Sequence, residues 1–556
     1  MNRVDFSVFD DSFGAKDGRS GDQQEDNDAQ LPEVCDLKAA FRSQQICPLF
    51  EYFHGSSKMT SALARNLFAI FNHFLKLTTI MKLLLPTICF ALIPLAVSAQ
   101  NRIGTGEVDK LYQQMCASCH GPELRGGLGS SLLDKDKFKY VGKTLSFADY
   151  VKQGNLAMGM PPFEGALDDG QLRAMEIYID EIRQKLVENR SASVKVMQDG
   201  SYEAGGHRFN LVTVSEAVKA PWSIAFLPDG GFLVTGKEGQ LYRISDMGSD
   251  AIDGLPEVWV HGQGGLLEVA LHPDYEENGW VYLSFAASSG KLNGVDVGIT
   301  KVVRGRIVAN HLVDQETIFE VPLELQLNSG VHFGSRFVFK DGYLYFGIGD
   351  RGPMQMAQDL TKPNGKIHRI YDDGRIPEDN PFVKVEGAYP SIWTYGNRNP
   401  QGLDLNPWTG EIWESEHGPR GGDEINLMTA GTNYGWPVIT YGMNYNGNPI
   451  SSKTAEEGMA QPKHYWTPSI AVCGIDFYEG KTFPLWTGSL LAGGLASQEL
   501  HLLGIKDDAV ISDEILLKDV GRVRDVAGGP DGMIYLVLNG PDRIVRMEPV
   551  GKKVTQ

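Results

Sequence analysis

The sequence predicts a multidomain protein in which a small all-α domain is followed by an all-β six-bladed β-propeller. Two observations carry this prediction. A unit made of a turn and a short apolar strand recurs six times between residues 204 and 550. The preceding residues 100–186 contain helical segments and none of these units. The chain has 556 residues, which is too many for one hydrophobic core, so at least two domains are required.

A short apolar segment near residue 90 has the pattern of a secretory signal peptide. Met81-Lys82 opens it, an almost wholly apolar run follows, and small residues end it at Ala99. The run is too short for a membrane span, which needs about 20 apolar residues. We therefore expect a signal peptide at 81–99, a periplasmic or secreted protein, and no stable membrane span.

Residues 1–80 precede this signal peptide, although such a signal belongs at an N-terminus. They are polar, acidic at 21–28 and without a clear period. We expect Met81 to be the functional start and residues 1–80 to be a non-native extension. Cleavage after Ala99 leaves three of the six cysteines, and the isolated Cys473 predicts a buried thiol.

Residues 116–120 form a haem attachment motif. Their sequence is C-A-S-C-H, and the segment before them, 108–115, has helical spacing. On one helical turn the thiols of Cys116 and Cys119 can each bond a haem vinyl group, while His120 faces the iron as its proximal ligand. A disulfide redox pair has the same spacing but belongs to a βαβ context, which is absent here. The motif therefore predicts covalently bound haem c.

The second iron ligand is expected in the loop Ala157–Phe163. Met160 lies directly before two prolines, and we prefer it to Met158, which the same loop also offers. A helix capped by Asp168-Asp169 is expected over 170–186. In both motifs and in this final helix, the segment resembles a class I bacterial cytochrome c. We assign residues 100–186 to a cytochrome c domain and 187–203 to a linker.

The turn-plus-strand units predict a β-propeller over residues 204–550. In each unit a turn rich in Pro, Asp or Gly precedes a short apolar strand, as in residues 227–235 and 529–536. Repeats of about 40 to 50 residues with several strands each are typical of propeller blades. A β-sandwich would not repeat the same unit so often. The 64 glycines and 28 prolines agree with a turn-rich β architecture.

Four segments of this region combine side chains that plain scaffolding does not need. They carry a histidine, several arginines and a glycine-rich acidic loop: residues 262–267, 331–352, 396–426 and 521–526. Arginines favour a polyanionic ligand through charge-assisted hydrogen bonds. Backbone oxygens beside Asp423 and Glu424 suit calcium. A histidine that is neutral near pH 7 suits a general base.

With these motifs, residues 205–550 resemble the soluble glucose and aldose sugar dehydrogenases that depend on pyrroloquinoline quinone (PQQ). The segments 220–230 and 433–437 match that family as well. The resemblance implies that His332 is the base that takes the proton from the C1 hydroxyl of the sugar. It also implies a set of residues around PQQ and the sugar: Gln263, Gln358, Arg398, Asn399, Arg522 and Arg524. It further implies calcium ligands: Gly418, Pro419, Asp423, Glu424 and Tyr434.

Three departures from the family pattern concern ligand contacts. Val331 stands where the glucose enzymes have an acidic residue, and Ala496 stands near a position where a lysine contacts the cofactor. The pair Tyr465-Trp466 only loosely matches the aromatic residues over the sugar. These departures leave the sugar and the strength of PQQ binding open.

Together the two resemblances imply oxidation of an aldose at C1 to a lactone, with PQQ, Ca²⁺ and haem c as cofactors. The haem would pass the electrons to a respiratory acceptor. The net charge of -19 and the absence of a basic run argue against nucleic acid as a partner. Two alternatives remain: a calcium-dependent propeller hydrolase of the lactonase kind, and a non-catalytic carbohydrate-binding propeller carried with an electron-transfer cytochrome.

Overall fold

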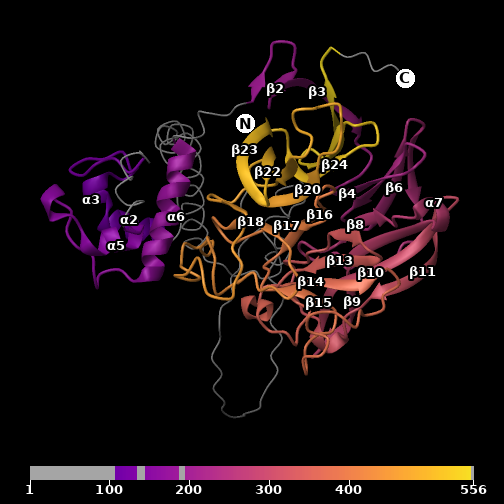
Figure 1. The fold of residues 1–556 in the computed structure, drawn as a ribbon, viewed down its shortest axis with the longest axis horizontal. Helices are drawn as coiled ribbons and strands as arrows, with labels where there is room; N and C mark the ends of the chain where they lie inside the picture. Colours follow the sequence, from indigo (N-terminus) through magenta and orange to yellow (C-terminus); the bar gives the residue numbers. More distant parts are fainter. Residues whose placement is uncertain (1–106, 134–144, 187–193, 552–556) are drawn as a thin grey trace, which may run out of the picture. The chain divides into compact units, whose positions relative to one another are not determined.

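The computed structural model describes residues 107–133, 145–186 and 194–551 (Figure 1). The helices and sheets of these residues belong to one compact unit, Arg102–Gln556. The predicted extension 1–80 and the predicted signal peptide 81–99 lie outside the described residues. Among the helices that the structure describes, none is long and apolar enough to span a membrane.

The first part of the unit is helical, as predicted. Its elements are α2 (Glu107–Met115), α3 (Ala117–His120), α5 (Phe147–Gln153), the 3₁₀ turn η5 (Leu156–Met158) and α6 (Asp169–Leu186). Asp168 and Gln171 cap α6 reciprocally, because each side chain accepts from the other's backbone N–H at 2.8 and 3.0 Å. One face of α6, including Met175 and Ile179, packs against Val108 and Tyr112 of α2. This packing forms the core of the helical domain.

Six antiparallel sheets form the rest of the unit, which confirms the six-bladed propeller. The first two contain β4 (Pro221–Phe226), β5 (Phe232–Gly236), β6 (Gln240–Ser245) and β7 (Gly248–Ile252), then β8 (Leu266–Leu271), β9 (Trp280–Leu292), β10 (Val295–Val308) and β11 (His311–Phe319). The next two contain β12 (Phe337–Lys340), β13 (Tyr343–Ile348), β14 (Lys366–Tyr371) and β15 (Ile392–Tyr395), then β16 (Pro400–Leu405), β17 (Ile412–Glu416), β18 (Asp423–Leu427) and β19 (His464–Trp466). The fifth contains β20 (Val472–Phe477), β21 (Leu490–Gly494), β22 (Glu499–Lys506) and β23 (Ala509–Lys518).

The sixth sheet closes the ring by joining both ends of the domain. It contains β24 (Arg522–Gly528), β25 (Ile534–Asn539) and β26 (Arg543–Pro549), with β3 (His207–Ser215) paired to β26. Two further strands extend this sheet: β1 (Lys195–Val196), which lies within the predicted linker 187–203, and β2 (Tyr202–Ala204), which begins in the linker and ends one residue beyond it. Because the last blade combines strands from the start and the end of the domain, the ring cannot open without breaking this pairing. Three short turns complete the domain: α7 (Tyr275–Asn278), η7 (Leu323–Leu325) and η8 (Met354–Ala357).

The first strands of the six sheets contact one another around the centre of the propeller. Contacts connect β12 to β16, β16 to β20, β20 to β24, β24 to β4 and β4 to β8. Apolar clusters fill the space between neighbouring sheets; one of them joins Leu233 of β5 to Leu283 of β9. Figure 1 shows the sheets following one another in chain order from β4 to β24. The segments that enter these central strands are therefore brought together at one end of the ring.

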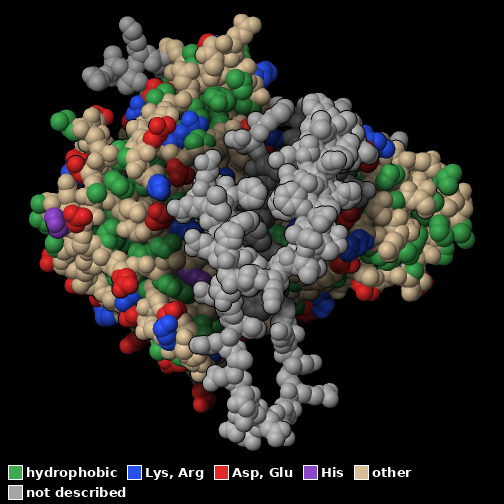
Figure 2. Space-filling model, turned by 180° about the vertical axis from the view of Figure 1, so that it is seen from behind, with side chains coloured by type: hydrophobic (Ala, Val, Ile, Leu, Met, Phe, Trp, Pro, Cys, Tyr) green, Lys and Arg blue, Asp and Glu red, His purple; other side chains and the backbone are tan. Residues whose placement is uncertain are grey.

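Charged side chains of both signs lie on the face drawn in Figure 2. Among the coloured residues of that face, acidic and basic side chains are interspersed without a continuous basic area.

Candidate active site

The predicted quinone and sugar residues lie on the segments that lead into the central strands. Gln263 precedes β8, His332 precedes β12, and Arg398 and Asn399 precede β16. Arg522 and Arg524 lie at the start of β24. Residues that are far apart in the sequence therefore meet at one end of the propeller. The closed ring of sheets is sufficient to bring them together.

His332 forms a tight pair with Asp350, which follows β13. The Nδ1 atom of His332 lies 2.6 Å from Oδ1 of Asp350, whose side chain is fully buried. The backbone N–H of His332 donates to Oε1 of Gln263 at 2.9 Å, and His332 has a positive φ of 54°. A non-glycine residue holds this conformation only where its surroundings impose it. An ionised Asp350 accepts a hydrogen bond from the N–H at Nδ1 of His332, so the lone pair of the imidazole is on Nε2.

The electrostatic surroundings keep this imidazole neutral. Burial lowers the pKa of His332, and the nearby Arg398 lowers it further, against the opposing effect of Asp350. Burial opposes the ionised form of Asp350, but the hydrogen bond from His332 and the charge of Arg398 outweigh it and hold the pKa of Asp350 below its usual value. A neutral histidine with an oriented lone pair is the state that a general base requires.

A second set of contacts fixes Asp350 and reaches Gln358. The indole Nε1 of Trp436 donates to Oδ2 of Asp350 at 2.7 Å. The side-chain amide of Gln358 donates to the carbonyl oxygen of Trp436 at 2.7 Å and to Oδ1 of Asn433 at 2.9 Å. Gln358 is thus connected to His332 through Trp436 and Asp350. The sequence motifs include Asp350 and Trp436, but their function could not be assigned because their partners are about 20 to 100 residues away.

Arg398 and His417 carry nitrogen atoms without a partner. Nη1 of Arg398 donates to the carbonyl oxygens of His417 and Gly418 at 2.9 and 2.8 Å, and its guanidinium lies 5.4 Å from the ring centroid of Trp436. Nε of Arg398 and Nε2 of His417 are buried and have no hydrogen-bond partner among the described residues. Buried polar atoms are normally paired. These atoms therefore fit the anionic, flat ligand that the resemblance implies.

Three further cations surround the same end of the ring. Burial lowers the pKa of Arg522, and the neighbouring Arg524 lowers it further. Burial also lowers the pKa of Lys237, again with a contribution from Arg524, and Nζ of Lys237 donates to the carbonyl oxygen of Gly262. Like charges held this close call for an anion between them. Lys237 was not among the predicted residues, because nothing in its local sequence distinguishes it from a surface lysine.

Arg336 connects the segments at this end of the ring. It is buried, and its guanidinium contacts Glu268 at 2.8 Å and Asp525 at 2.9 Å. It also donates to the carbonyl oxygens of Gln401 and Arg524, both at 2.9 Å. One side chain thus connects the segments of four sheets. Asn399 has a similar function, because its Oδ1 accepts from the backbone N–H of Gly334 at 3.2 Å.

The predicted calcium ligands form a tight loop. A side chain at Gly418 would place its Cβ 1.6 Å from the oxygen of Gly422, so only glycine fits there. The carbonyl oxygen of Gly418 accepts from Arg398, and that of Pro419 accepts from Ser469 Oγ at 2.8 Å. A carbonyl oxygen has two lone pairs, so that of Gly418 can still bind a cation, whereas that of Pro419 also accepts from the backbone N–H of Gly422 at 3.1 Å. The carbonyl oxygen of Gly418 therefore fits a calcium ligand, and that of Pro419 would have to give up one of its hydrogen bonds to become one.

The three other predicted calcium ligands are largely engaged elsewhere. Both carboxylate oxygens of Asp423 accept backbone N–H groups at 3.0 Å, from Gly418 and Val472. The hydroxyl of Tyr434 donates to Leu427 and accepts from Thr429. Glu424 is buried, and burial together with the nearby Glu416 raises its pKa well above the usual value. Among the described residues, no group of three or more His, Cys, Asp or Glu side chains is arranged to hold a metal.

The haem motif lies on the short helix α3 and the residue before it. Cys116 directly follows α2 and is the N-cap of α3, which carries Cys119 and His120. Nδ1 of His120 lies 2.8 Å from the carbonyl oxygen of Ser130, which orients the imidazole and leaves Nε2 for an iron. Met160 packs against the apolar cluster around Val151, Leu167 and Leu172, whereas Met158 is 80 % exposed. Both methionines remain candidates for the second axial position.

Three remaining residues from the sequence analysis have clear places. Cys473 is fully buried, as predicted, and its Sγ lies 3.5 Å from Nη1 of Arg524. Trp466 is buried and donates to Asp513, so it does not face a substrate. Tyr465 is partly exposed and stacks on Tyr441 with 3.8 Å between ring centroids.

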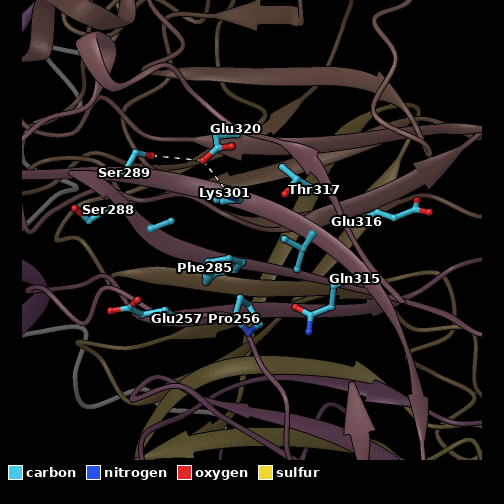
Figure 3. Close-up of a pocket in the computed structure, with 12 residues that line it drawn as sticks. Pro256, Glu257, Phe285, Ser288, Ser289, Lys301, Gln315, Glu316, Thr317 and Glu320 are labelled. Atoms are coloured by element: carbon cyan, nitrogen blue, oxygen red, sulfur yellow. Dashed lines mark hydrogen bonds and ion pairs between the residues drawn. The ribbon is translucent and has the colours of Figure 1, made fainter. Parts of the chain in front are cut away.

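A hollow on the second sheet is separate from this site. It measures about 460 Å³ and is lined by residues of β9, β10, β11 and the segment before β8, including Phe285, Lys301 and Glu316. In Figure 3, Ser289 and Lys301 both point to Glu320, at 3.5 and 3.0 Å. It contains none of the predicted site residues, and its lysine is already paired. It therefore does not compete with the end of the ring as the active site.

Comparisons with known proteins identify both domains. The family described as Glucose / Sorbosone dehydrogenase matches residues 218–546, and the family described as Cytochrome C oxidase, cbb3-type, subunit III matches residues 105–179. The Aldose sugar dehydrogenase YliI of Escherichia coli (strain K12) is 42% identical over 340 residues, covering 59% of this chain and 89% of that protein.

Solved structures agree with the first of these matches. The apo-form of the soluble aldose sugar dehydrogenase from Escherichia coli has a TM-score of 0.58 at 39% identity, covering 61% of this chain and 99% of that one. The PQQ-bound form of the aldose sugar dehydrogenase from Streptomyces coelicolor has a TM-score of 0.50 at 28% identity, covering 61% and 98%. The chain therefore belongs to the glucose/sorbosone dehydrogenase family of propeller oxidoreductases and carries a cytochrome c domain ahead of the propeller.

Proposed function

We propose that this protein oxidises an aldose at C1 to the lactone with PQQ and Ca²⁺, and passes the electrons to a covalently bound haem c. The observation that carries the proposal is the pair of His332 and Asp350 beside Arg398, whose Nε has no partner among the described residues. A base next to unpaired cationic donors is what sugar oxidation with an anionic quinone requires. A propeller used only for binding would need neither.

His332 acts on the sugar. With Nδ1 held by Asp350, its Nε2 takes the proton of the C1 hydroxyl, which makes the C1 hydrogen a better hydride donor. Burial keeps the imidazole neutral before the reaction. Asp350 then stabilises the protonated imidazole, and Trp436 holds Asp350 in place.

The remaining residues bind and orient. Arg398, Arg522 and Arg524, with Lys237, would hold PQQ through its carboxylates, while the carbonyl oxygens of Gly418 and Pro419 would hold calcium. When bound, PQQ supplies a two-electron acceptor for the C1 hydride, and calcium polarises its carbonyl group. Gln263, through its contact with His332, and Gln358 would line the pocket.

The cytochrome domain provides a one-electron carrier. Cys116 and Cys119 would attach the haem, with His120 and Met160 as axial ligands, and the haem would deliver electrons to a respiratory acceptor. Met160→Ala should then remove the weak near-infrared band of methionine–iron ligation; the same loss in Met158→Ala instead would reassign the ligand. Haem attachment of this kind takes place after export, which agrees with a signal peptide at 81–99 and a periplasmic or secreted location.

The test is reconstitution of the purified chain with PQQ and Ca²⁺, followed by a panel of aldoses with a dye as acceptor. We expect a quinone absorption band on reconstitution and dye reduction that depends on both additions. Dye reduction should be lost in His332→Gln and retained in His272→Gln, since His272 pairs with Asp372 at 3.0 Å outside the site. Lactone hydrolysis without a quinone band would instead identify a propeller hydrolase.

A further inference from the structure

Two loops of the propeller contact the helices of the cytochrome domain. The first contains Arg420, whose Nε donates to Oε1 of Glu181 on α6 at 2.9 Å and whose Nη2 donates to Oε2 at 2.6 Å. The side chain of Glu181 is only 4% exposed, and that of Arg420 is 19% exposed. A bidentate pair between guanidinium and carboxylate fixes orientation as well as distance. A pair this deeply buried is also costly to leave half formed.

The second loop, residues 441–449, adds apolar and polar contacts. Met443 is 1% exposed and belongs to the apolar cluster of α2 and α6, together with Val108 and Ile177. Nη2 of Arg173 on α6 donates to the carbonyl oxygen of Tyr441 at 3.0 Å. An apolar centre with polar contacts around it is the composition of a specific interface.

The backbones also fit closely. A side chain at Gly421 would place its Cβ 2.8 Å from Cγ2 of Ile177, and one at Gly447 would place its Cβ 2.9 Å from the backbone nitrogen of Val108. Both glycines have positive φ, 85° at Gly421 and 84° at Gly447. The two loops thus approach α6 and α2 at a distance that side chains would prevent.

These contacts lie next to the proposed site. Arg420 follows Gly418 and Pro419 directly in the chain, and its carbonyl oxygen accepts from the backbone N–H of Met443 at 2.9 Å. The segment that touches α6 is therefore continuous with the loop whose carbonyl oxygens would hold calcium. No other part of the described interface is this close in sequence to the site.

We propose that residues 419–421 and 441–449 are the docking surface for the chain's own cytochrome domain, held by the Glu181–Arg420 pair so that the haem receives electrons from the propeller within one molecule. The proposal rests on the proposed function. Each aldose oxidised releases two electrons and two protons. The electrons reduce the haem iron from Fe(III) to Fe(II) one at a time, with reoxidation by the external acceptor in between, and the protons leave to solvent.

The test compares Glu181→Gln with Asp180→Asn in the full chain. Both remove one negative charge from α6 at neighbouring positions, but the carboxylate of Asp180 pairs with Arg183 of its own helix. We expect Glu181→Gln to slow haem reduction by aldose about tenfold or more, since it leaves Arg420 without its ionic partner. Dye-coupled oxidation should be unchanged in both variants, and haem reduction should be unchanged in Asp180→Asn.

A second measurement does not depend on activity. Hydrogen–deuterium exchange of the full chain should become faster at residues 419–421 and 441–449 in Glu181→Gln, and not in Asp180→Asn. In a double-mutant cycle, Arg420→Gln added to Glu181→Gln should slow haem reduction no further, because the two side chains act as one unit.

The outcomes separate the two proposals. Unchanged haem reduction and unchanged exchange in Glu181→Gln would overturn the docking surface. So would an equal loss of dye-coupled oxidation and haem reduction, because Glu181 would then act on the sugar site itself. If the wild type oxidises no aldose with dye, the proposed function fails; the exchange experiment then still decides whether these loops bind the cytochrome domain.

Discussion

The two redox sites of this chain are built in opposite ways. The thiols and the imidazole expected to hold the haem lie within five consecutive residues, Cys116 to His120, on one short helix and its N-cap. The proposed sugar site draws on residues from Lys237 to Arg524, which only the closed ring of six sheets brings together. The haem site therefore depends on local chain geometry, whereas the propeller site depends on long-range packing. Substitutions in the two regions should therefore have separable effects.

The largest expected effect is that of damaged haem attachment in Cys119→Ser. Only the thioether bond to Cys116 can then form, so the haem should be misplaced and electron delivery to the natural acceptor should stop. Dye-coupled oxidation should be preserved, because the propeller site is built without any residue of the motif. Haem staining of denatured protein and dye reduction measure the two effects. Loss of both activities would show that the two sites are not separable.

The next largest effect is expected from His332→Ala. Removal of a general base typically lowers the rate by about 10² to 10⁴. PQQ and haem should remain bound, because the base acts on the sugar. The turnover number with saturating dye measures the first effect and absorption spectra measure the second. His272→Ala is the matched control, and a similar loss in that variant would point to general destabilisation instead.

A smaller effect is expected from Asp350→Asn, at the low end of that range, about 10²-fold. The amide cannot hold His332 in the same tautomer with the same charge. Asp350 raises the pKa of His332 against burial and Arg398, so its neutralisation should lower that pKa further. The acidic limb of the pH–rate profile, below which His332 is protonated and inactive, should move to lower pH. Asp372→Asn, which alters the corresponding partner of His272, should leave the profile unchanged. A limb that moves to higher pH would contradict the assignment.

The sequence predicted those parts of the fold and of the two sites that belong to long motifs or regular repeats. The fold class, the haem motif and the buried Cys473 followed from spacing and repeats. His332 and Arg398 followed from long motifs that resemble a known family. Asp350 and Lys237 did not follow, because an aspartate or lysine acquires its function here only from partners in other blades.

The pairing of β3 with β26 and the docking of α6 on Arg420 were also beyond the sequence. Both are contacts between segments separated by more than 200 residues. Local propensity and periodicity describe which face of a strand or helix is apolar, but they do not identify the surface that covers it. The closure of the ring and the interface of the two domains therefore emerged only from the structure.

The smallest expected effect is weaker cofactor binding in Lys237→Met. PQQ carries three carboxylates, and Lys237 supplies a cationic group close to Arg524 at this end of the ring. Loss of one charge-assisted contact should weaken PQQ binding about tenfold. Titration of the apo chain with PQQ, followed by fluorescence quenching, measures this. Lys340→Met is the control, because Nζ of Lys340 donates to the carbonyl oxygen of Gly410 on another part of the propeller. Equal affinities in both variants would remove Lys237 from the site.

The central claim is that electrons pass between the two sites within one molecule. Stopped-flow spectroscopy tests it directly, by mixing an aldose with the oxidised, PQQ-loaded chain at several low protein concentrations. We expect that the quinone band bleaches, that the haem is then reduced, and that the rate constant of haem reduction does not depend on protein concentration. A haem that stays oxidised after the quinone is reduced, or a rate constant that rises in proportion to protein concentration, would contradict it.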